Sequence, residues 1–108
     1  MTFQEALKSI SAYPVQFRTL AEIAESRGLN LLSEITADDF KSKSYRLAKA
    51  DLLYWLSLAP NVSQGGQSFS FSEEQRKAMK IEANAIYSEL EPEKNAVMPT
   101  FGYKGDKL

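Results

Sequence analysis

The sequence predicts a mainly α-helical fold: a small bundle of four to five helices, one short β segment at about 67–72, and a flexible C-terminal tail. Through most of the first 90 positions, apolar residues recur at the three-to-four-residue spacing of amphipathic helices. A polar, glycine-rich stretch interrupts this spacing, and strict alternation of serine and phenylalanine follows it. Prolines bracket the polar end of the chain. We therefore expect a helical domain over 1–90 and an extended tail over 91–108.

Two short helices are predicted at the start of the chain. Thr2 and Glu5 have the spacing of a capping box, in which each side chain hydrogen-bonds the other residue's backbone N–H. The buried face of this first helix comprises Phe3, Ala6, Leu7 and Ile10. Pro14 ends it and can occupy the first position of a second helix. Arg27 and Gly28 end that second helix, whose regularly spaced apolar residues are Phe17, Leu20, Ile23 and Ala24.

The middle of the chain predicts a connector and then the central helix. An apolar connector covers 29–35, and Thr36 and Asp38 are candidate helix caps. Residues 38–40 form either a separate short helical turn or the first turn of the long helix. From 44 to 58 apolar residues cover most of the helical circumference, which is typical of a helix surrounded by others. Pro60 ends this helix.

The helical spacing of apolar residues stops after Pro60. The polar stretch 61–67 predicts a loop, and 68–72 predicts a strand with two phenylalanines on one face. Ser72 and Gln75 form a second capping box, which opens a helix to about Leu90 with the apolar face Met79, Ala83, Ile86 and Leu90. A single strand is not stable alone. It must pair with an unforeseen segment of this chain, pair with another copy, or be an irregular loop held to the core by its phenylalanines.

The composition narrows the possible functions. The 108 residues include no cysteine and no histidine, which excludes disulfides, thiol or histidine-based catalysis and Cys/His zinc sites. A net charge of -1 gives no overall attraction to nucleic acid or anionic lipid. No apolar run approaches the roughly 18 residues that span a bilayer. We therefore expect a soluble protein without enzymatic activity, cofactor or metal.

Three polar patterns have both a functional and a structural interpretation. Asp38 and Asp39 suit a helix start better than a cation site, because no calcium-loop spacing surrounds them. The stretch 64–67 lacks the lysine and the glycine spacing of a phosphate-binding loop. A basic cluster at 41–49 predicts either a solvated helix face or a nucleic-acid site. Its members are Lys41, Lys43, Arg46 and Lys49.

The order of the segments resembles that of a known family. Residues 45–56 read YRLAKADLLYWL, 59–67 form a polar connection, and 68–72 read SFSFS before a charged helix. Over approximately 13–90 this arrangement resembles the head-tail connector (adaptor) proteins of tailed bacteriophages. It is most similar to uncharacterised phage or prophage proteins of Bacteroides-type bacteria. Such proteins are small helical bundles with a strand-forming connection before the last long helix.

The resemblance implies a structural role. Connector proteins assemble as a homo-oligomeric ring between portal and tail proteins and extend a channel through which DNA passes without specific binding. The protein would then act in the virion or in the bacterial host cytoplasm, with no membrane partner. By position, the implied interface with other subunits or partners comprises Gln64, Gly65, Gly66, Gln67, Phe69, Phe71, Phe101 and Tyr103.

Two other functions stay open on the sequence. A small helical module could bind a protein partner through 91–108, and a DNA-binding regulator could use the basic cluster at 41–49. The ring hypothesis makes its own prediction. Replacing Phe69 and Phe71 with serine is expected to weaken assembly without unfolding the subunit.

Overall fold

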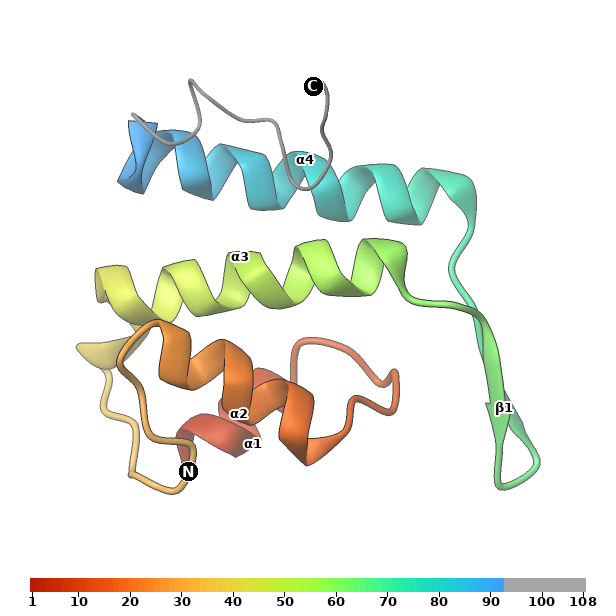
Figure 1. The fold of residues 1–108 in the computed structure, drawn as a ribbon, viewed down its shortest axis with the longest axis horizontal. Helices are drawn as coiled ribbons and strands as arrows, with labels where there is room; N and C mark the ends of the chain where they lie inside the picture. Colours follow the sequence, from red (N-terminus) through yellow and green to blue (C-terminus); the bar gives the residue numbers. More distant parts are fainter. Residues whose placement is uncertain (93–108) are drawn as a thin grey trace.

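A computed structural model describes residues 1–92, and this part of the chain has the predicted mainly helical architecture. In chain order the elements are α1 (Phe3–Lys8), α2 (Phe17–Ser26), the 3-10 helix η1 (Asp39–Lys41), α3 (Lys43–Leu58), β1 (Val62–Gln64), β2 (Gln67–Phe69) and α4 (Glu73–Leu90). Helix α3 lies in the middle, with α4 along one side and α1 and α2 on the other (Figure 1). The two strands project from the end where α3 and α4 connect.

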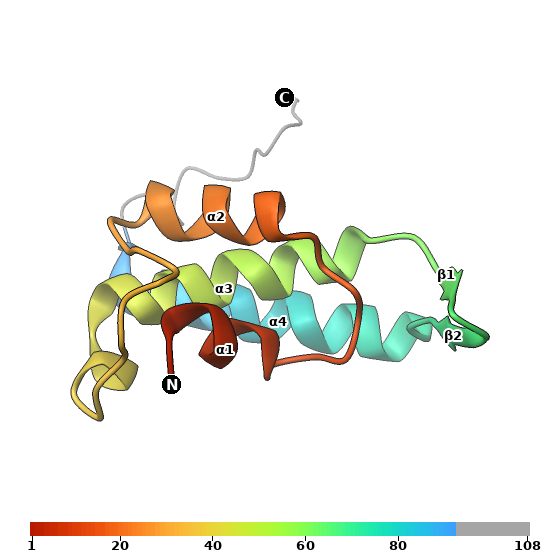
Figure 2. The same ribbon diagram turned by 90° about the horizontal axis from the view of Figure 1, so that it is seen from below.

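The core lies on two faces of α3, as the apolar circumference of this helix predicts. One face packs against α1, α2 and the connector, and the largest fully buried side chains are Leu7, Leu20, Leu52 and Leu56. The opposite face packs against α4 through Leu47, Ala50, Leu53, Ala83 and Ile86. Seen from below, α1 and α2 lie on either side of the α3 axis (Figure 2). The fold is therefore built around one central helix.

Helix α1 has only six residues and is stabilised at its start by local and distant contacts. The predicted capping box is present: the Glu5 N–H donates to Thr2 Oγ1, and the Thr2 N–H donates to Glu5 Oε1 at 2.8 Å. The next two free N–H groups, of Phe3 and Gln4, donate to connector carbonyls of residues 33 and 31. The helix ends at Lys8, two residues before Ile10, the last residue of the predicted buried face, and Ile10 still packs partly against the core.

The start of α2 differs from the prediction. Pro14 is not in the helix, because the Val15 N–H turns back to the Tyr13 carbonyl at 2.9 Å and delays the helix to Phe17. Phe17 consequently lies outside the core with 53% of its surface exposed, whereas Leu20 and Ala24 are buried as predicted. The predicted end is confirmed, since Gly28 adopts a φ of 79° just after Arg27.

The segment before α3 forms a separate short turn and not the first turn of the long helix. The backbone N–H of Asp39 donates to Thr36 Oγ1, and the N–H of Thr36 donates to the Asp39 carboxylate at 2.8 Å. These two hydrogen bonds hold the turn before η1, which is a separate short element; its N-cap residue is Asp38, whose side chain makes no cap hydrogen bond. The cap of α3 is Ser42, whose Oγ accepts the Tyr45 N–H at 3.2 Å. Helix α3 therefore begins at Lys43, one residue before the predicted start.

The prediction of a lone strand over 68–72 is wrong. Residues 62–64, expected as loop, form β1 and pair antiparallel with β2, with Val62 opposite Phe69 and Gln64 opposite Gln67. The strand ends at Phe69, so Phe71 follows it. Of the outcomes left open by the sequence, pairing within the chain is the observed one.

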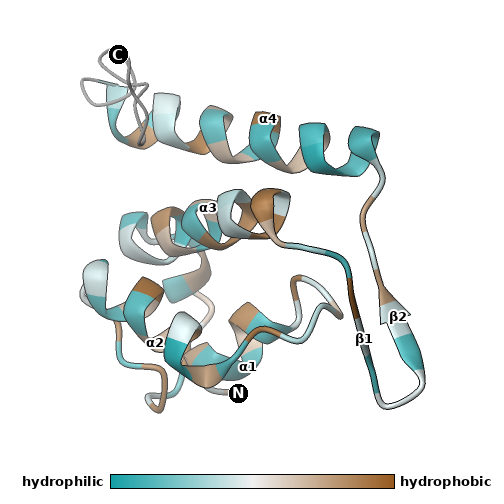
Figure 3. Cartoon of the chain, turned by 45° about the vertical axis from the view of Figure 1, so that its right-hand side comes forward, coloured by the Kyte–Doolittle hydropathy of each residue, from teal (hydrophilic) through white to brown (hydrophobic). Residues whose placement is uncertain are grey.

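Helix α4 begins at the predicted capping box, in which the Gln75 N–H donates to Ser72 Oγ at 3.1 Å. Ala83 and Ile86 are buried, and Met79 and Leu90 pack partly against the core. Much of the remaining surface of α4 is hydrophilic (Figure 3). The tail predictions, Phe101 and Tyr103 included, lie outside the described residues.

Candidate functional site

The β-hairpin is held in shape by its two-glycine turn. Gly65 and Gly66 have φ values of 60° and 79°, which glycine adopts without the steric cost that a Cβ imposes. Two consecutive residues with positive φ match the right-handed twist of paired strands. The predicted interface residues Gln64 to Gln67 are all exposed at this turn. They form the tip of the hairpin, which is the part most distant from the helices (Figure 1).

The two faces of the hairpin have different surroundings. Val62 and Phe69, opposite each other, pack partly against the α1–α2 side of the core. Ser63 and Ser68 are exposed, and their hydroxyl oxygens lie 3.3 Å apart. The alternation of side chains along a strand accounts for this division. One face of the hairpin is therefore anchored to the body while the other faces outward.

An aromatic cluster anchors the base of the hairpin. The Tyr13 ring stacks on Phe71 at 5.6 Å between centroids and meets Trp55 edge-on at 5.9 Å. The Tyr13 hydroxyl donates to the Pro60 carbonyl at 2.6 Å. These contacts join the loop before α2, the end of α3 and the segment that follows β2. Phe69 and Phe71, predicted to face a neighbouring subunit, are partly buried and pack against the chain's own core.

Arg76 of α4 fixes the hairpin from the other side. Its guanidinium donates to the carbonyls of Ser57 and Ala59 at 3.1 and 2.6 Å and to Asn61 Oδ1 at 2.8 Å. The same group lies 5.6 Å from the centroid of the Phe71 ring. Carbonyls at a helix C-terminus have no partner within the helix, and a cation there is favourable. The Arg76 side chain therefore caps the C-terminal carbonyls of α3 and holds Asn61, the residue just before β1.

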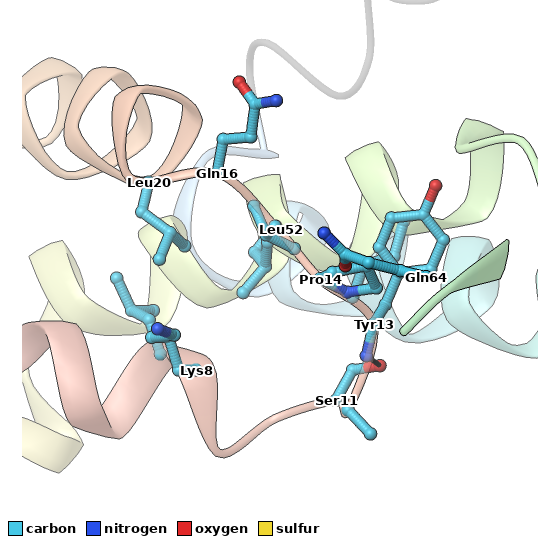
Figure 4. Close-up of a pocket in the computed structure, with 12 residues that line it drawn as sticks. Lys8, Ser11, Tyr13, Pro14, Gln16, Leu20, Leu52 and Gln64 are labelled. Carbon is cyan, nitrogen blue, oxygen red and sulfur yellow. Dashed lines mark hydrogen bonds between the residues drawn. The ribbon is translucent and has the colours of Figure 1, made fainter. Parts of the chain in front are cut away.

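A surface groove runs between the loop before α2 and the base of the hairpin. We call it the Trp55 groove; its main lining residues are Tyr13, Pro14, Trp55, Pro60, Val62 and Gln64, and its volume is about 360 Å³. A neighbouring cavity of about 400 Å³ shares several of these residues and continues toward α1. Gln64 reaches from β1 toward the Tyr13–Pro14 turn (Figure 4). No charged residue lines the Trp55 groove.

The basic cluster at 41–49 is partly neutralised by α4. Arg46 donates two hydrogen bonds of 2.7 Å to the Glu89 carboxylate, which raise the pKa of Arg46 and lower that of Glu89. Lys49 lies 3.8 Å from the Glu82 carboxylate. Lys41 and Lys43 are exposed. Half of the predicted basic surface thus takes part in contacts between α3 and α4.

A partly buried network joins the three largest helices, and sequence reasoning missed it. Arg27, at the end of α2, donates hydrogen bonds of 2.7 and 2.9 Å to the Asp51 carboxylate of α3 and one of 3.2 Å to Glu91. The Tyr87 hydroxyl of α4 donates to the same Asp51 carboxylate. Hydrogen bonding to Asp51 raises the pKa of Arg27, and burial followed by hydrogen bonding to Asp51 raises that of Tyr87. Glu91, predicted as tail, is thereby tied to the body.

Residues 1–92 were compared with the patterns of metal sites and membrane-spanning helices. Within 1–92 no group of three or more acidic side chains is placed to hold a metal ion. None of the helices in this part of the chain is long and apolar enough to cross a membrane. Tyr13, Trp55 and Arg76 are the residues around the hairpin that sequence reasoning did not connect with it. The signal available for Tyr13 was only its position before Pro14.

Comparison with known proteins assigns the chain to a family. No curated protein and no solved structure matches it significantly. A family model matches residues 1–100, which cover the whole described part of the chain. The chain therefore belongs to DUF6706, a family of unknown function.

Proposed function

We propose that this protein is a structural component of a phage or prophage particle: a head-tail connector that forms a ring of identical subunits between portal and tail. The observation that carries the proposal is the exposed β-hairpin, held firmly at its base and projecting from one end of the helical body. Its position between α3 and the last long helix also matches the resemblance in segment order.

The hairpin has the chemistry of an assembly element. In a hairpin closed by two residues, the pair beside the turn exchanges hydrogen bonds and the next pair does not. Ser63 and Ser68 form that next pair, so their backbone N–H and C=O groups point outward along the two edges. A two-stranded sheet is marginally stable alone, and its open edges readily pair with another strand. A neighbouring subunit would supply that strand.

The charge distribution suits a channel that DNA traverses without being bound. The net charge is near zero, and Arg46 and Lys49 are engaged with carboxylates of α4. Phosphate binding requires cations that are available to the backbone of the nucleic acid. The proposal therefore includes transient passage of DNA through the ring. It names portal and tail proteins as partners, and it locates the protein in the virion or the host cytoplasm.

The edge hypothesis is tested with Ser68→Pro and its matched control Ser68→Ala. Proline removes the outward N–H of β2 without removing a donor of the internal strand pairing, whereas alanine removes only the hydroxyl. We expect Ser68→Pro to shift the protein to monomer in size-exclusion chromatography with light scattering, and Ser68→Ala to assemble as the unchanged chain does. Equal assembly of both variants would show that this edge is not the interface.

The two alternatives predict other results. A DNA-binding regulator using the cluster at 41–49 requires DNA affinity that falls with salt, so a flat gel-shift titration at low salt excludes it. A binding module that uses 91–108 captures its partner as a monomer and loses capture when these residues are deleted. The connector that we propose assembles into rings and shows neither behaviour.

A further inference from the structure

We propose that the Trp55 groove of one subunit binds the C-terminal segment of a neighbouring subunit through residues 97–101, Val-Met-Pro-Thr-Phe. The inference rests on the proposed ring, because it requires a second copy of the chain. It deepens that proposal by naming a contact between subunits that is separate from the strand edges.

The groove has the composition that receives extended, proline-containing segments. Trp55 and the two prolines, Pro14 and Pro60, form its walls, and Val62 adds an aliphatic surface. Aromatic rings set beside a shallow apolar groove are a recurrent means of binding proline-containing chains, which lose little conformational entropy on binding. The volume of about 360 Å³ lies in the range of binding pockets.

Polar groups at the rim suit the backbone of such a segment. The exposed amides of Gln16 and Gln64 lie along the groove. Each amide both donates and accepts hydrogen bonds, as the N–H and C=O groups of an extended chain require. Because the lining carries no charge, it favours an uncharged occupant over a charged one.

The sequence beyond the described residues contains one uncharged apolar run. Residues 97–101 combine valine, methionine, proline and phenylalanine with a threonine, and charged residues lie on either side, at Lys94 and Lys104. The proline matches the aromatic walls, and the flanking lysines would remain in solvent. This run is the part of 93–108 that fits the groove best.

The length of the chain assigns the segment to a neighbour's groove. Helix α4 ends at Leu90, at the end of the molecule opposite to the hairpin (Figure 1), and its 18 residues extend about 27 Å. The groove also lies on the α1–α2 side of α3, away from α4, because Trp55 packs in that cluster. Seven residues separate Pro92 from Pro99 and span at most about 25 Å. This reach is shorter than α4 itself, so we assign the segment to the groove of a neighbouring subunit.

Trp55 is the single tryptophan of the chain, so its fluorescence reports on the groove. We compare the full chain with Phe101→Ser, using Lys104→Ala as the matched control outside the run. In the assembled protein we expect Phe101→Ser to shift Trp55 emission to longer wavelength and to increase its quenching by acrylamide. Lys104→Ala should leave both unchanged. A synthetic peptide of residues 93–108 should reverse the effect of Phe101→Ser, and the same peptide carrying serine at 101 should not.

The remaining outcomes separate this inference from the ring. Unchanged emission of Phe101→Ser in a protein that still assembles overturns the groove contact and leaves the ring intact. If the difference between the full chain and Phe101→Ser persists on dilution to monomer, the segment binds its own subunit and the inter-subunit assignment is wrong. If the protein never assembles but the peptide still shifts Trp55 emission in Phe101→Ser, the groove binds the segment and the ring proposal fails.

Discussion

The carboxylate of Asp51 shows how much of this fold depends on single side chains. It accepts hydrogen bonds from Arg27 of the α2 terminus and from Tyr87 of α4, so one residue of the central helix connects both of its neighbours. All three side chains are partly shielded from water, which strengthens the interaction relative to an exposed pair. Removing one partner leaves the others with unsatisfied polar groups.

We expect Tyr87→Phe to lower the free energy of unfolding by about 1–2 kcal/mol at neutral pH, because the hydrogen bond to Asp51 is lost. The variant also changes the pH dependence. The folded state holds the Tyr87 pKa above its ordinary value of 10.0, so above that pH the unfolded chain loses a proton that the folded chain retains. Stability of the unchanged protein therefore falls as pH rises beyond about 10.

Urea unfolding at about pH 8 and pH 11 measures this effect. The free energy of unfolding should fall less between about pH 8 and about pH 11 in Tyr87→Phe than in the unchanged protein. Tyr45, whose pKa burial also raises, is present in both proteins, and its contribution cancels in the comparison. An equal loss in the two proteins would contradict the assignment.

At the scale of elements, the hairpin depends on its attachment to the helices. Only three residue pairs form the sheet, which is too few for independent stability. Arg76 and the Tyr13 cluster supply the missing contacts. The orientation of the strands relative to α3 and α4 is consequently set at the base, while the tip remains exposed.

We expect Arg76→Ala to lower the free energy of unfolding by about 1–3 kcal/mol, since carbonyls of residues 57 and 59 lose their donor. Arg76→Lys keeps the charge but not the forked geometry, and should recover only part of the loss. The exposed Lys77→Ala serves as the neighbouring control and should have little effect. Thermal unfolding followed by circular dichroism measures the three variants. A loss in Lys77→Ala equal to that in Arg76→Ala would contradict the role of Arg76.

Local signals predicted the helices well and the hairpin poorly. Both capping boxes, at Thr2 and Ser72, were predictable because every partner lies within three residues. The strand at 62–64 was missed because its serine and glutamine resemble a loop. Gly65 and Gly66 between Val62 and Phe69 were the available hairpin signal.

At the scale of the whole molecule, the contacts between distant residues were not predictable. Arg27 has a role at the end of α2 that the sequence indicates, but its pairing with Asp51 depends on how α2 crosses α3. The basic cluster at 41–49 is likewise not a simple solvated face, because α4 places Glu82 and Glu89 beside Lys49 and Arg46. Such pairs follow from the packing of helices, which no local pattern encodes.

The packing also revises one expectation for the assembled molecule. Serine at Phe69 and Phe71 was expected to affect assembly alone, yet both rings pack against the subunit's own core. Their removal should destabilise the fold as well. The tip at 64–67 and the two strand edges stay exposed to a neighbouring strand. We therefore propose that the strand contact between subunits uses the backbone of the hairpin and not these two aromatic side chains, in addition to the contact proposed at the Trp55 groove.

Native mass spectrometry of the full-length chain over a range of concentrations tests the central claim most directly. The account predicts a closed oligomer of one defined stoichiometry that grows at the expense of monomer as concentration rises, because head-to-tail contacts between identical subunits generate a ring where the rotation between neighbours closes. A protein that stays monomeric at every concentration, alone and mixed with a phage portal protein, would contradict it.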